Sequence, residues 1–284
     1  MSLVAAGVRC LCQGERFASV FRYEAPPEGE TRFQSSAVSA YHREVLQCQA
    51  CGHFVSVHEM PTEGLYTGDY VSSTYGDDGI RRAFERITSL DPARSDNVGR
   101  VTRVLEFAAQ HLPESRSPPR SILDVGSGLC VFLHRMKAAG WDCTALDPDI
   151  RSVTHARERV GVRSVCAEFP AASSLGCFDV VTFNKVLEHI KNPVAILANA
   201  QRHLKPGGFV YVEVPDGEAA SVAGPEREEF FVDHWHIFSA ASLALLMGRA
   251  GFLLHTLERL REPSGKYTLR GFAMPQSNTG SSNV

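Results

Sequence analysis

The first 120 residues contain two kinds of hydrophobic pattern. Short runs of alternating apolar and polar residues, separated by polar connections, predict strands at residues 17–23, 43–46 and 53–57. Residues 64–78 are rich in Tyr, Ser, Gly and Asp, which favours an ordered loop, whereas residues 97–112 keep the 3.6-residue period of a helix. The pattern predicts a small β-rich unit over residues 1–62, followed by a linker loop and helices at 63–120.

From Ser121 onward, strand-like and helix-like segments alternate. Near-continuous apolar runs predict buried strands at residues 122–125, 142–146, 162–166, 178–183 and 208–214. Intervening patterns predict helices at residues 129–139, 149–159, 193–204 and 239–250. The turn EPSG joins a last antiparallel pair of strands at 253–260 and 267–273, before a disordered tail at 275–284. Alternating units of this kind predict an α/β domain over residues 121–274, with helices on both faces of a parallel sheet.

Composition and charge narrow the possible functions. Apolar residues make up 44% of the 284 residues, which is enough for a full hydrophobic core and excludes a disordered chain. With 29 basic and 32 acidic residues the net charge is -3, so we do not expect non-specific nucleic-acid binding. The longest mostly apolar run, residues 243–254, is too short to span a membrane, and the N-terminus has no secretion signal pattern. We therefore expect a cytoplasmic protein.

A glycine-containing loop follows the first strand of the α/β domain. The segment SILDVGSGLCVFL places Asp124, Gly126, Ser127 and Gly128 between a strand and a helix, where bare backbone N–H groups can approach a ligand. Asp147 ends the next strand, and a carboxylate there can accept hydrogen bonds from both ribose hydroxyls. The third glycine of the dinucleotide fingerprint is replaced by Val131, which makes NAD the weaker candidate. A nucleotide-like ligand is expected.

Four motifs in order give the α/β domain a family resemblance. DVGSG, the acid Asp147, FDVVTF followed by NKVLEHI, and LKPGGFVYVEV resemble the successive motifs of class I S-adenosylmethionine-dependent methyltransferases. The resemblance implies a Rossmann-like seven-stranded sheet and S-adenosylmethionine as cofactor, with Cys130 standing where many members carry a third glycine. It also implies that the cofactor is held by Asp124, Gly126, Ser127, Gly128, Asp147, Pro148, Glu168 and Asn184, of which Asp147 takes the ribose, Glu168 the adenine edge and Asn184 the region of the methyl group.

Histidines near the carboxyl edge of the sheet are candidate bases. A hydroxyl becomes a competent nucleophile when a base takes its proton, and imidazole, with an ordinary pKa of about 6.5, suits that role at cellular pH. His189 follows the fourth strand, and Asp233 and His234 lie in a segment rich in aromatic residues. The alternative is that these side chains only tie down their loops by hydrogen bonds. Lys185 occupies the place of the first acid in E-x-x-E-H metal-binding turns, so we do not expect a catalytic metal.

Four of the eight cysteines lie in the β-rich unit. Cys48 and Cys51 have the spacing of a zinc knuckle, and Cys10 and Cys12 supply the other pair for a closed structural site. His42 or His53 is an alternative ligand, and reduced cysteines without metal are the alternative to zinc. The remaining cysteines lie singly in apolar stretches and are expected in the core: Cys130, Cys143, Cys166 and Cys177.

The order of a cysteine-bearing unit, a tyrosine-rich stretch and an α/β domain resembles a narrower group, the bacterial methyltransferases of nucleotide-linked or polysaccharide sugars. That resemblance implies that Tyr70 or Tyr75 lies near the methyl group and that Asp233 and His234 join His189 as catalytic candidates. Because the chain ends at Val284, without the additional domain of sugar C-methyltransferases, O-methylation of a sugar or other small hydroxyl is expected over C-methylation of a keto-sugar.

Three other functions compete with this hypothesis. A nicotinamide-dependent sugar oxidoreductase or epimerase shares the strand–glycine–acid arrangement but should carry a third glycine and a Tyr-x-x-x-Lys pair. A non-catalytic module would use the zinc knuckle for docking. An RNA methyltransferase would need a basic face with stacking aromatics, and we interpret Arg81, Arg82, Arg100 and Arg103 as a solvated face instead.

Overall fold

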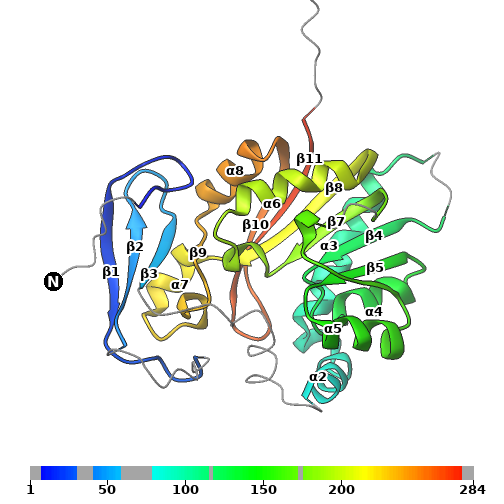
Figure 1. Cartoon of the computed structure of the whole chain (residues 1–284), viewed down its shortest axis with the longest axis horizontal. Coiled ribbons are helices and arrows are strands. Elements are labelled where there is room, and N and C mark those ends of the chain that lie inside the picture. The colour runs from blue at the N-terminus through cyan, green and yellow to red at the C-terminus, as the bar shows by residue number, and fades with distance from the viewer. Residues whose placement is uncertain (1–7, 31–40, 59–78, 115–117, 172–174, 277–284) are drawn as a thin grey trace, which may run out of the picture.

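A computed structural model gives the fold, and it describes residues 8–30, 41–58, 79–114, 118–171 and 175–276. The described chain forms two sheets, a four-stranded sheet near the N-terminus and a seven-stranded sheet in the α/β region (Figure 1). Among the described residues, no helix is both long and apolar enough to cross a membrane. Tyr70, Tyr75 and residues 277–284 of the tail predicted at 275–284 lie outside the described residues, whereas Pro275 belongs to the last strand of the large sheet.

The small sheet is antiparallel and takes its last strand from the far end of the chain. Its order is β1-β2-β3-β9, with strands β1 (Phe17–Tyr23), β2 (Arg43–Cys48), β3 (Phe54–His58) and β9 (His236–Ile237). The first three confirm the strands predicted from alternation. β9 was not predicted, because a two-residue strand has no periodic signal and exists only through its pairing with β3. Thus a segment of the α/β region completes the N-terminal sheet.

The large sheet has the order β10-β11-β8-β7-β4-β5-β6. Its strands are β4 (Ser121–Val125), β5 (Asp142–Asp147), β6 (Arg163–Cys166), β7 (Phe178–Asn184), β8 (Leu204–Pro215), β10 (Phe252–Arg261) and β11 (Tyr267–Pro275). β4 to β8 are parallel, whereas β11 runs antiparallel to both β8 and β10. The predicted α/β sheet with a terminal hairpin is confirmed. The strand order reverses at β4 and β7, and ligands of open α/β sheets bind at such a switch point.

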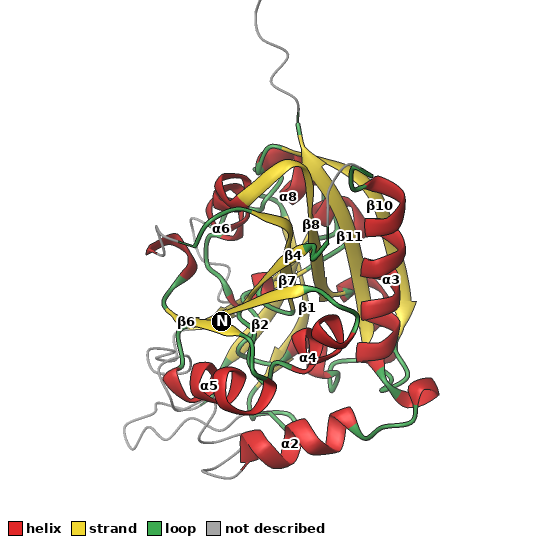
Figure 2. Ribbon diagram, turned by 90° about the vertical axis from the view of Figure 1, so that its right-hand side faces the viewer, coloured by secondary structure: helices red, strands yellow, loops and turns green. Residues whose placement is uncertain are grey.

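Helices cover both faces of this sheet and bury two separate apolar layers (Figure 2). Alternate residues of β4 point to opposite layers, Ile122 to one and Leu123 to the other. The apolar layer that contains Ile122 is completed by α3 (Asp96–His111), α4 (Val131–Ala138) and the π-helical turn η3 (Ala156–Val160). The layer that contains Leu123 is completed by α6 (Pro193–Asn199) and α8 (Ala240–Arg249). The remaining elements are α2 (Gly79–Thr88), α5 (Ile150–His155), α7 (Gly217–Ala223) and the short 3-10 turns η2 (Pro92–Arg94), η4 (Phe169–Ala171), η5 (Leu187–His189), η6 (Ala200–His203) and η7 (Glu228–Phe230).

Three predicted helices differ from the structure. The helix expected at 129–139 starts at Val131, because Cys130 has a left-handed φ of 58°. The helix expected at 149–159 is α-helical only to His155 and then widens into η3, which ends at Gly161 with a φ of 68°. The helix expected at 193–204 tightens into 3-10 geometry after Asn199. Hydrophobic period alone does not distinguish these variants.

Candidate active site

The glycine loop after β4 closes tightly against its neighbours. Gly126 has a φ of 68°, and a Cβ atom there would come within 2.7 Å of the Val186 side chain, so no larger residue fits. The N–H of Gly126 donates to the carbonyl of Leu146 at 2.8 Å, and the N–H of Gly128 donates to the carboxylate of Asp147 at 2.8 Å. The loop predicted from sequence is therefore held directly beside the acid at the end of β5.

Asp124 lies buried at the end of β4 and is held by two donors from β7. Its Oδ1 atom accepts from the Thr182 hydroxyl and from the Asn184 amide, each at 2.7 Å. Burial raises the pKa of Asp124 to about 6, against the opposing effect of these hydrogen bonds. Sequence analysis found Asp124 and Asn184 but missed Thr182, whose only signal is its place in the apolar strand FDVVTF.

Two polar atoms at this switch point have no hydrogen-bond partner among the residues that the structure describes. They are the hydroxyl oxygen of Ser127 and the Oδ1 atom of Asn184, and both are buried. Buried polar atoms are nearly always hydrogen-bonded, so an orphaned hydroxyl and an orphaned amide oxygen indicate a place for a polar ligand. A ligand with an ammonium group and a carboxylate would satisfy both atoms. The residues present thus fit the amino-acid end of S-adenosylmethionine.

The outer part of the predicted cofactor site lies at the ends of β5 and β6. Asp147 accepts from the N–H of Asp149 at 2.9 Å as well as from Gly128, and burial raises its pKa. Pro148 is exposed beside it. Glu168 follows β6 and is exposed, and its neighbour Ala167 donates its N–H to the Asp147 carbonyl at 3.2 Å. The described cofactor candidates therefore lie at, or just after, the carboxyl ends of β4, β5, β6 and β7.

A cavity of about 250 Å³ opens beside the end of β7. Most of its lining is charged, and it comprises Asp96, Arg100, Lys185, Glu188, His189, Glu213, Pro215, Glu228, Glu229, Phe231, Asp233, His234, Glu262, Lys266, Tyr267 and Thr268. All three catalytic candidates are in this set. The cavity is therefore a candidate site for a polar acceptor.

His189 and His234 are close in space although they are distant in sequence. Asp233, which directly precedes His234, is 44 positions from His189. Their ring centroids are 4.8 Å apart. Nδ1 of His189 lies 2.9 Å from the Asp233 carbonyl and Nδ1 of His234 lies 2.8 Å from the Glu229 carbonyl. Because a carbonyl only accepts, each Nδ1 carries a proton, so the neutral form of either ring would have its lone pair on Nε2.

Asp233 supplies a carboxylate to both rings. Its Oδ2 atom lies 3.6 Å from Nδ1 of His189 and 4.0 Å from Nε2 of His234. Burial alone would raise the pKa of Asp233, but His234 and His189 outweigh burial and hold this pKa below its ordinary value. The predicted set of His189, Asp233 and His234 is thus one cluster in space. Glu188, His189 and His234 also present ligand-type atoms within 4.8 Å of one another, a spacing that one divalent cation could bridge.

Sequence analysis missed an ionic network along one wall of the cavity. Glu213, fully buried on β8, accepts from Arg100, Arg270 and the hydroxyl of Tyr211. Despite burial, the two arginines and Lys185 lower the pKa of Glu213 far below its ordinary value. The interpretation of Arg100 as part of a solvated face was wrong, because α3 directs it inward to Glu213. The charged residues of this network lie on α3, β8 and β11, which are distant in sequence, so no local sequence pattern predicts that they are in contact.

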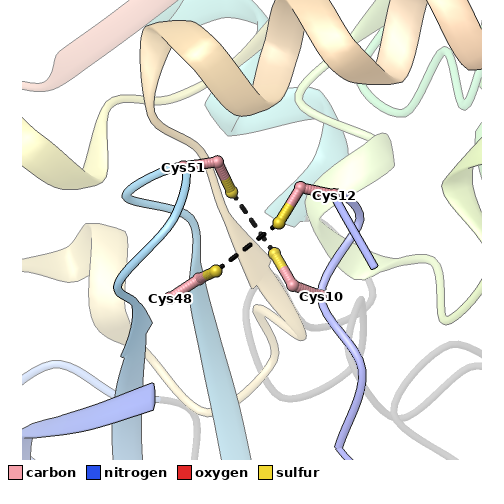
Figure 3. Close-up of side chains that lie close together, drawn as sticks. All are labelled: Cys10, Cys12, Cys48 and Cys51. Atoms are coloured by element: carbon pink, nitrogen blue, oxygen red, sulfur yellow. Dashed lines mark hydrogen bonds between the residues drawn. The ribbon is translucent and has the colours of Figure 1, made fainter. Parts of the chain in front are cut away.

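The four N-terminal cysteines form a second cluster, and their sulfur atoms point to a common centre (Figure 3). Sγ of Cys10 lies 3.4 Å from that of Cys51, and Sγ of Cys12 lies 3.6 Å from that of Cys48. Tetrahedral zinc with Zn–S bonds of about 2.3 Å separates its sulfurs by about 3.8 Å, so the four thiols fit this ion.

The other cysteines and histidines fall elsewhere. His53 bonds to Ser242 and His236 rather than joining the cluster. Cys130 and Cys143 are buried as predicted, but Cys166 and Cys177 are exposed, which corrects their assignment to the core. Cys166 ends β6, whose residues are exposed or only partly buried, and Cys177 lies just before the buried strand β7. An apolar neighbourhood in sequence therefore does not guarantee burial.

Curated relatives match the α/β region. A ubiquinone biosynthesis O-methyltransferase from Caulobacter vibrioides is 34% identical over 99 residues, which are 32% of this chain and 39% of the relative. A tRNA U34 carboxymethyltransferase from Azotobacter vinelandii is 33% identical over 148 residues, 47% of this chain and 46% of the relative. The chain thus spans about half or less of the length of these relatives.

Solved structures share the fold. A 1,6-didemethyltoxoflavin-N1-methyltransferase from Burkholderia thailandensis, with S-adenosylhomocysteine bound, has a TM-score of 0.56 at 20% identity and covers 89% of this chain and 100% of its own. A magnesium protoporphyrin IX methyltransferase from Synechocystis PCC 6803 has a TM-score of 0.55 at 14% identity, covering 74% of this chain and 98% of its own.

A family model for the methyltransferase domain matches residues 94–257, which is more than half of the chain. This segment carries the glycine loop, the acid that ends β5, the orphaned polar atoms and the histidine cluster. The chain therefore belongs to this methyltransferase family, of the class I S-adenosylmethionine-dependent type.

Proposed function

We propose that the protein transfers a methyl group from S-adenosylmethionine to a hydroxyl oxygen of a small polar acceptor. The observation that carries this proposal is the pair of imidazoles, His189 and His234, which line a cavity beside the end of β7 and whose Nδ1 atoms are bonded to backbone carbonyls. A hydroxyl needs a proton acceptor during methyl transfer, and imidazole is well suited to this.

The geometry of the switch point supports a set of proposed cofactor contacts. Ser127 and Asn184 offer their orphaned oxygen atoms to the carboxylate and ammonium of the methionyl group, and Asp124 adds a negative charge. Asp147 accepts the ribose hydroxyls, with Pro148 and Glu168 beside the adenine. When bound, S-adenosylmethionine supplies an electrophilic methyl group on sulfur. Tyr70 remains a proposed contact from the loop outside the described residues.

The reaction needs alignment and one proton transfer. A lone pair of the acceptor oxygen attacks the methyl carbon, the C–O bond forms as the S–C bond breaks, and sulfur retains the electron pair. The hydroxyl proton passes to Nε2 of His189 or His234. Asp233, held ionised between the two rings, stabilises the imidazolium that forms.

The charged lining of the cavity favours a hydrophilic acceptor with several hydroxyls, and we propose a sugar or a nucleotide-linked sugar. The relatives named above act on a ubiquinone precursor and on tRNA, so a phenolic hydroxyl is the second candidate for the acceptor. C-methylation of a keto-sugar would also need a base, to remove the proton from the carbon beside the carbonyl, so it stays an alternative to O-methylation. A docking role without catalysis would not require the paired imidazoles.

For the amino-terminal cluster we propose structural zinc, bound by Cys10, Cys12, Cys48 and Cys51. Four thiolates leave the ion no open position for a substrate, as in other closed structural sites. Zinc would then stabilise the fold and take no part in methyl transfer.

The histidine roles are tested by comparing His189→Ala, His234→Ala and the double variant with wild type. Using radiolabelled S-adenosylmethionine and a panel of sugars, nucleotide sugars and catechols, turnover should fall on the order of 100-fold or more in at least one single variant. Binding of S-adenosylhomocysteine should stay unchanged in both single variants. Full activity of both single variants and of the double variant would contradict the histidine mechanism.

A further inference from the structure

A buried ion pair of the N-terminal unit forms hydrogen bonds with the backbone just before the catalytic candidates Asp233 and His234. Arg43, at the start of β2, is 0% exposed, and its guanidinium donates to the carbonyl of Phe230 and, at 3.1 Å, to Glu30. Glu30 in turn accepts the N–H of Val232 at 2.7 Å. The two charges therefore hold one carbonyl and one amide, two residues apart, immediately before Asp233.

Two tyrosines make further contacts with this ion pair. The hydroxyl of Tyr41 donates to Oε2 of Glu30 at 2.5 Å and accepts from Nε of Arg43 at 3.1 Å. The guanidinium lies 4.1 Å from the centre of the Tyr23 ring, and the Tyr23 hydroxyl donates to the carbonyl of Pro225 at 2.8 Å. Each of the three guanidinium nitrogens thus donates to an acceptor while one face lies on the Tyr23 ring, and these contacts together fix the orientation of the group.

The segment held by these hydrogen bonds is followed directly by residues that line the cavity. Phe230 and Val232 are fully buried, and the next two residues are Asp233 and His234. The carbonyl of Asp233 in turn fixes the tautomer of His189. A shift of this short segment would therefore move both the carboxylate and both imidazoles, because all three depend on the backbone at 229–234.

Stability alone does not account for such a pair. A buried ion pair costs so much desolvation that well-packed apolar residues usually serve the fold equally well. What apolar residues do not supply is direction, since only hydrogen bonds fix where a backbone carbonyl and amide point.

We propose that Arg43 and Glu30 are positioning residues for methyl transfer, by which the N-terminal unit holds the Asp233–His234 segment in its catalytic geometry. This inference rests on the proposed function of the histidine cluster. It assigns to the N-terminal unit a part in the reaction that is distinct from binding zinc.

The test uses the full chain saturated with S-adenosylhomocysteine and labelled with 15N-histidine. In wild type, the Nδ1–H groups of His189 and His234 should give slowly exchanging NMR signals, because each is bonded to a buried carbonyl. In Arg43→Lys, which keeps the charge but loses the planar fork, these signals should shift or exchange at least tenfold faster. Affinity for S-adenosylhomocysteine should change by less than twofold.

Matched variants make the result decisive. Glu44→Gln neutralises the neighbouring buried charge of β2, which pairs with Arg22, and should leave both histidine signals as in wild type. Tyr41→Phe removes only the hydroxyl that joins Arg43 to Glu30, and it serves if Arg43→Lys fails to fold. Unchanged histidine signals in a folded Arg43→Lys protein, or in Tyr41→Phe if the former is unfolded, would overturn the proposal. Because this readout requires no methyl transfer, failure of the proposed function is detected separately, by the turnover assay.

Discussion

At the scale of single residues, the cofactor end of the site depends on atoms with unusual constraints. Gly126 has no room for a side chain. Cys130 adopts a left-handed conformation, with a φ of 58°, which costs less energy for glycine than for a residue with a Cβ atom. Ser127 and Asn184 keep buried oxygen atoms without hydrogen-bond partners in the described part of the chain. Such features cost stability in the free protein, and each is relieved or used when a ligand binds.

Asp124 makes cofactor binding depend on pH. Burial raises the pKa of Asp124 to about 6. Between about pH 4 and pH 6 the folded protein therefore keeps a proton on Asp124 that the unfolded chain has released. As pH rises through this range, Asp124 increasingly lowers the stability of the fold. The ammonium of the ligand favours the ionised carboxylate. Affinity for S-adenosylhomocysteine should therefore rise from pH 5 to pH 6.5, by at most about tenfold per unit, and then level off.

Calorimetry of S-adenosylhomocysteine at a series of pH values checks this expectation. Asp124→Asn serves as the control, because it should bind more weakly at neutral pH and show a flatter profile. An affinity for wild type that is constant from pH 5 to 7 would rule out a protonated Asp124 in the free protein.

At the scale of elements, the sequence predicted most of the regular structure and less of what joins it. The seven strands of the large sheet follow from apolar runs, which depend only on local pattern and burial. β9 did not follow, since its two residues are a strand only because β3 lies beside them. The Arg43–Glu30 pair and the Glu213 network were likewise hidden, because their partners come from distant elements. Motif positions such as Asp124 and Asp147 were accessible because each lies at the carboxyl end of a predictable strand.

The four-cysteine cluster lies beside α8, the helix that follows β9. The carbonyl of Leu11 accepts from Arg249, and the carbonyl of Cys51 accepts from the Ser239 hydroxyl at 2.5 Å. Purified protein should contain one zinc per chain, and Cys48→Ser should lose that zinc and melt at a lower temperature, because metal binding contributes directly to folding.

Elemental analysis and thermal melting of the two proteins check this prediction. Cys177→Ser, at an exposed cysteine outside the cluster, should keep the full zinc content and the wild-type melting temperature. Wild-type protein that contains no zinc and whose melting temperature is unaffected by Cys48→Ser would exclude a structural metal.

At the scale of the whole molecule, the two sheets meet at the chain between β8 and α8, which pairs with β3 through β9 and bonds back to Pro215 of β8. The large sheet supplies the switch point with Asp124 and Asn184, and the chain between β8 and α8 supplies Asp233 and His234. That same chain adds β9 to the small sheet and is held there by the buried Arg43–Glu30 pair. The N-terminal unit is thus joined to the proposed acceptor site by both backbone pairing and buried charge.

The central claim is that the switch point binds a methyl donor, and it is tested most directly by titrating the full chain with S-adenosylhomocysteine in a calorimeter, with NAD in parallel. We predict micromolar binding of S-adenosylhomocysteine, no heat from NAD, and an affinity reduced at least tenfold in Asp147→Ala, because the ribose hydroxyls then lose their acceptor. Binding of NAD, or the absence of S-adenosylhomocysteine binding to folded wild-type protein, would contradict the account.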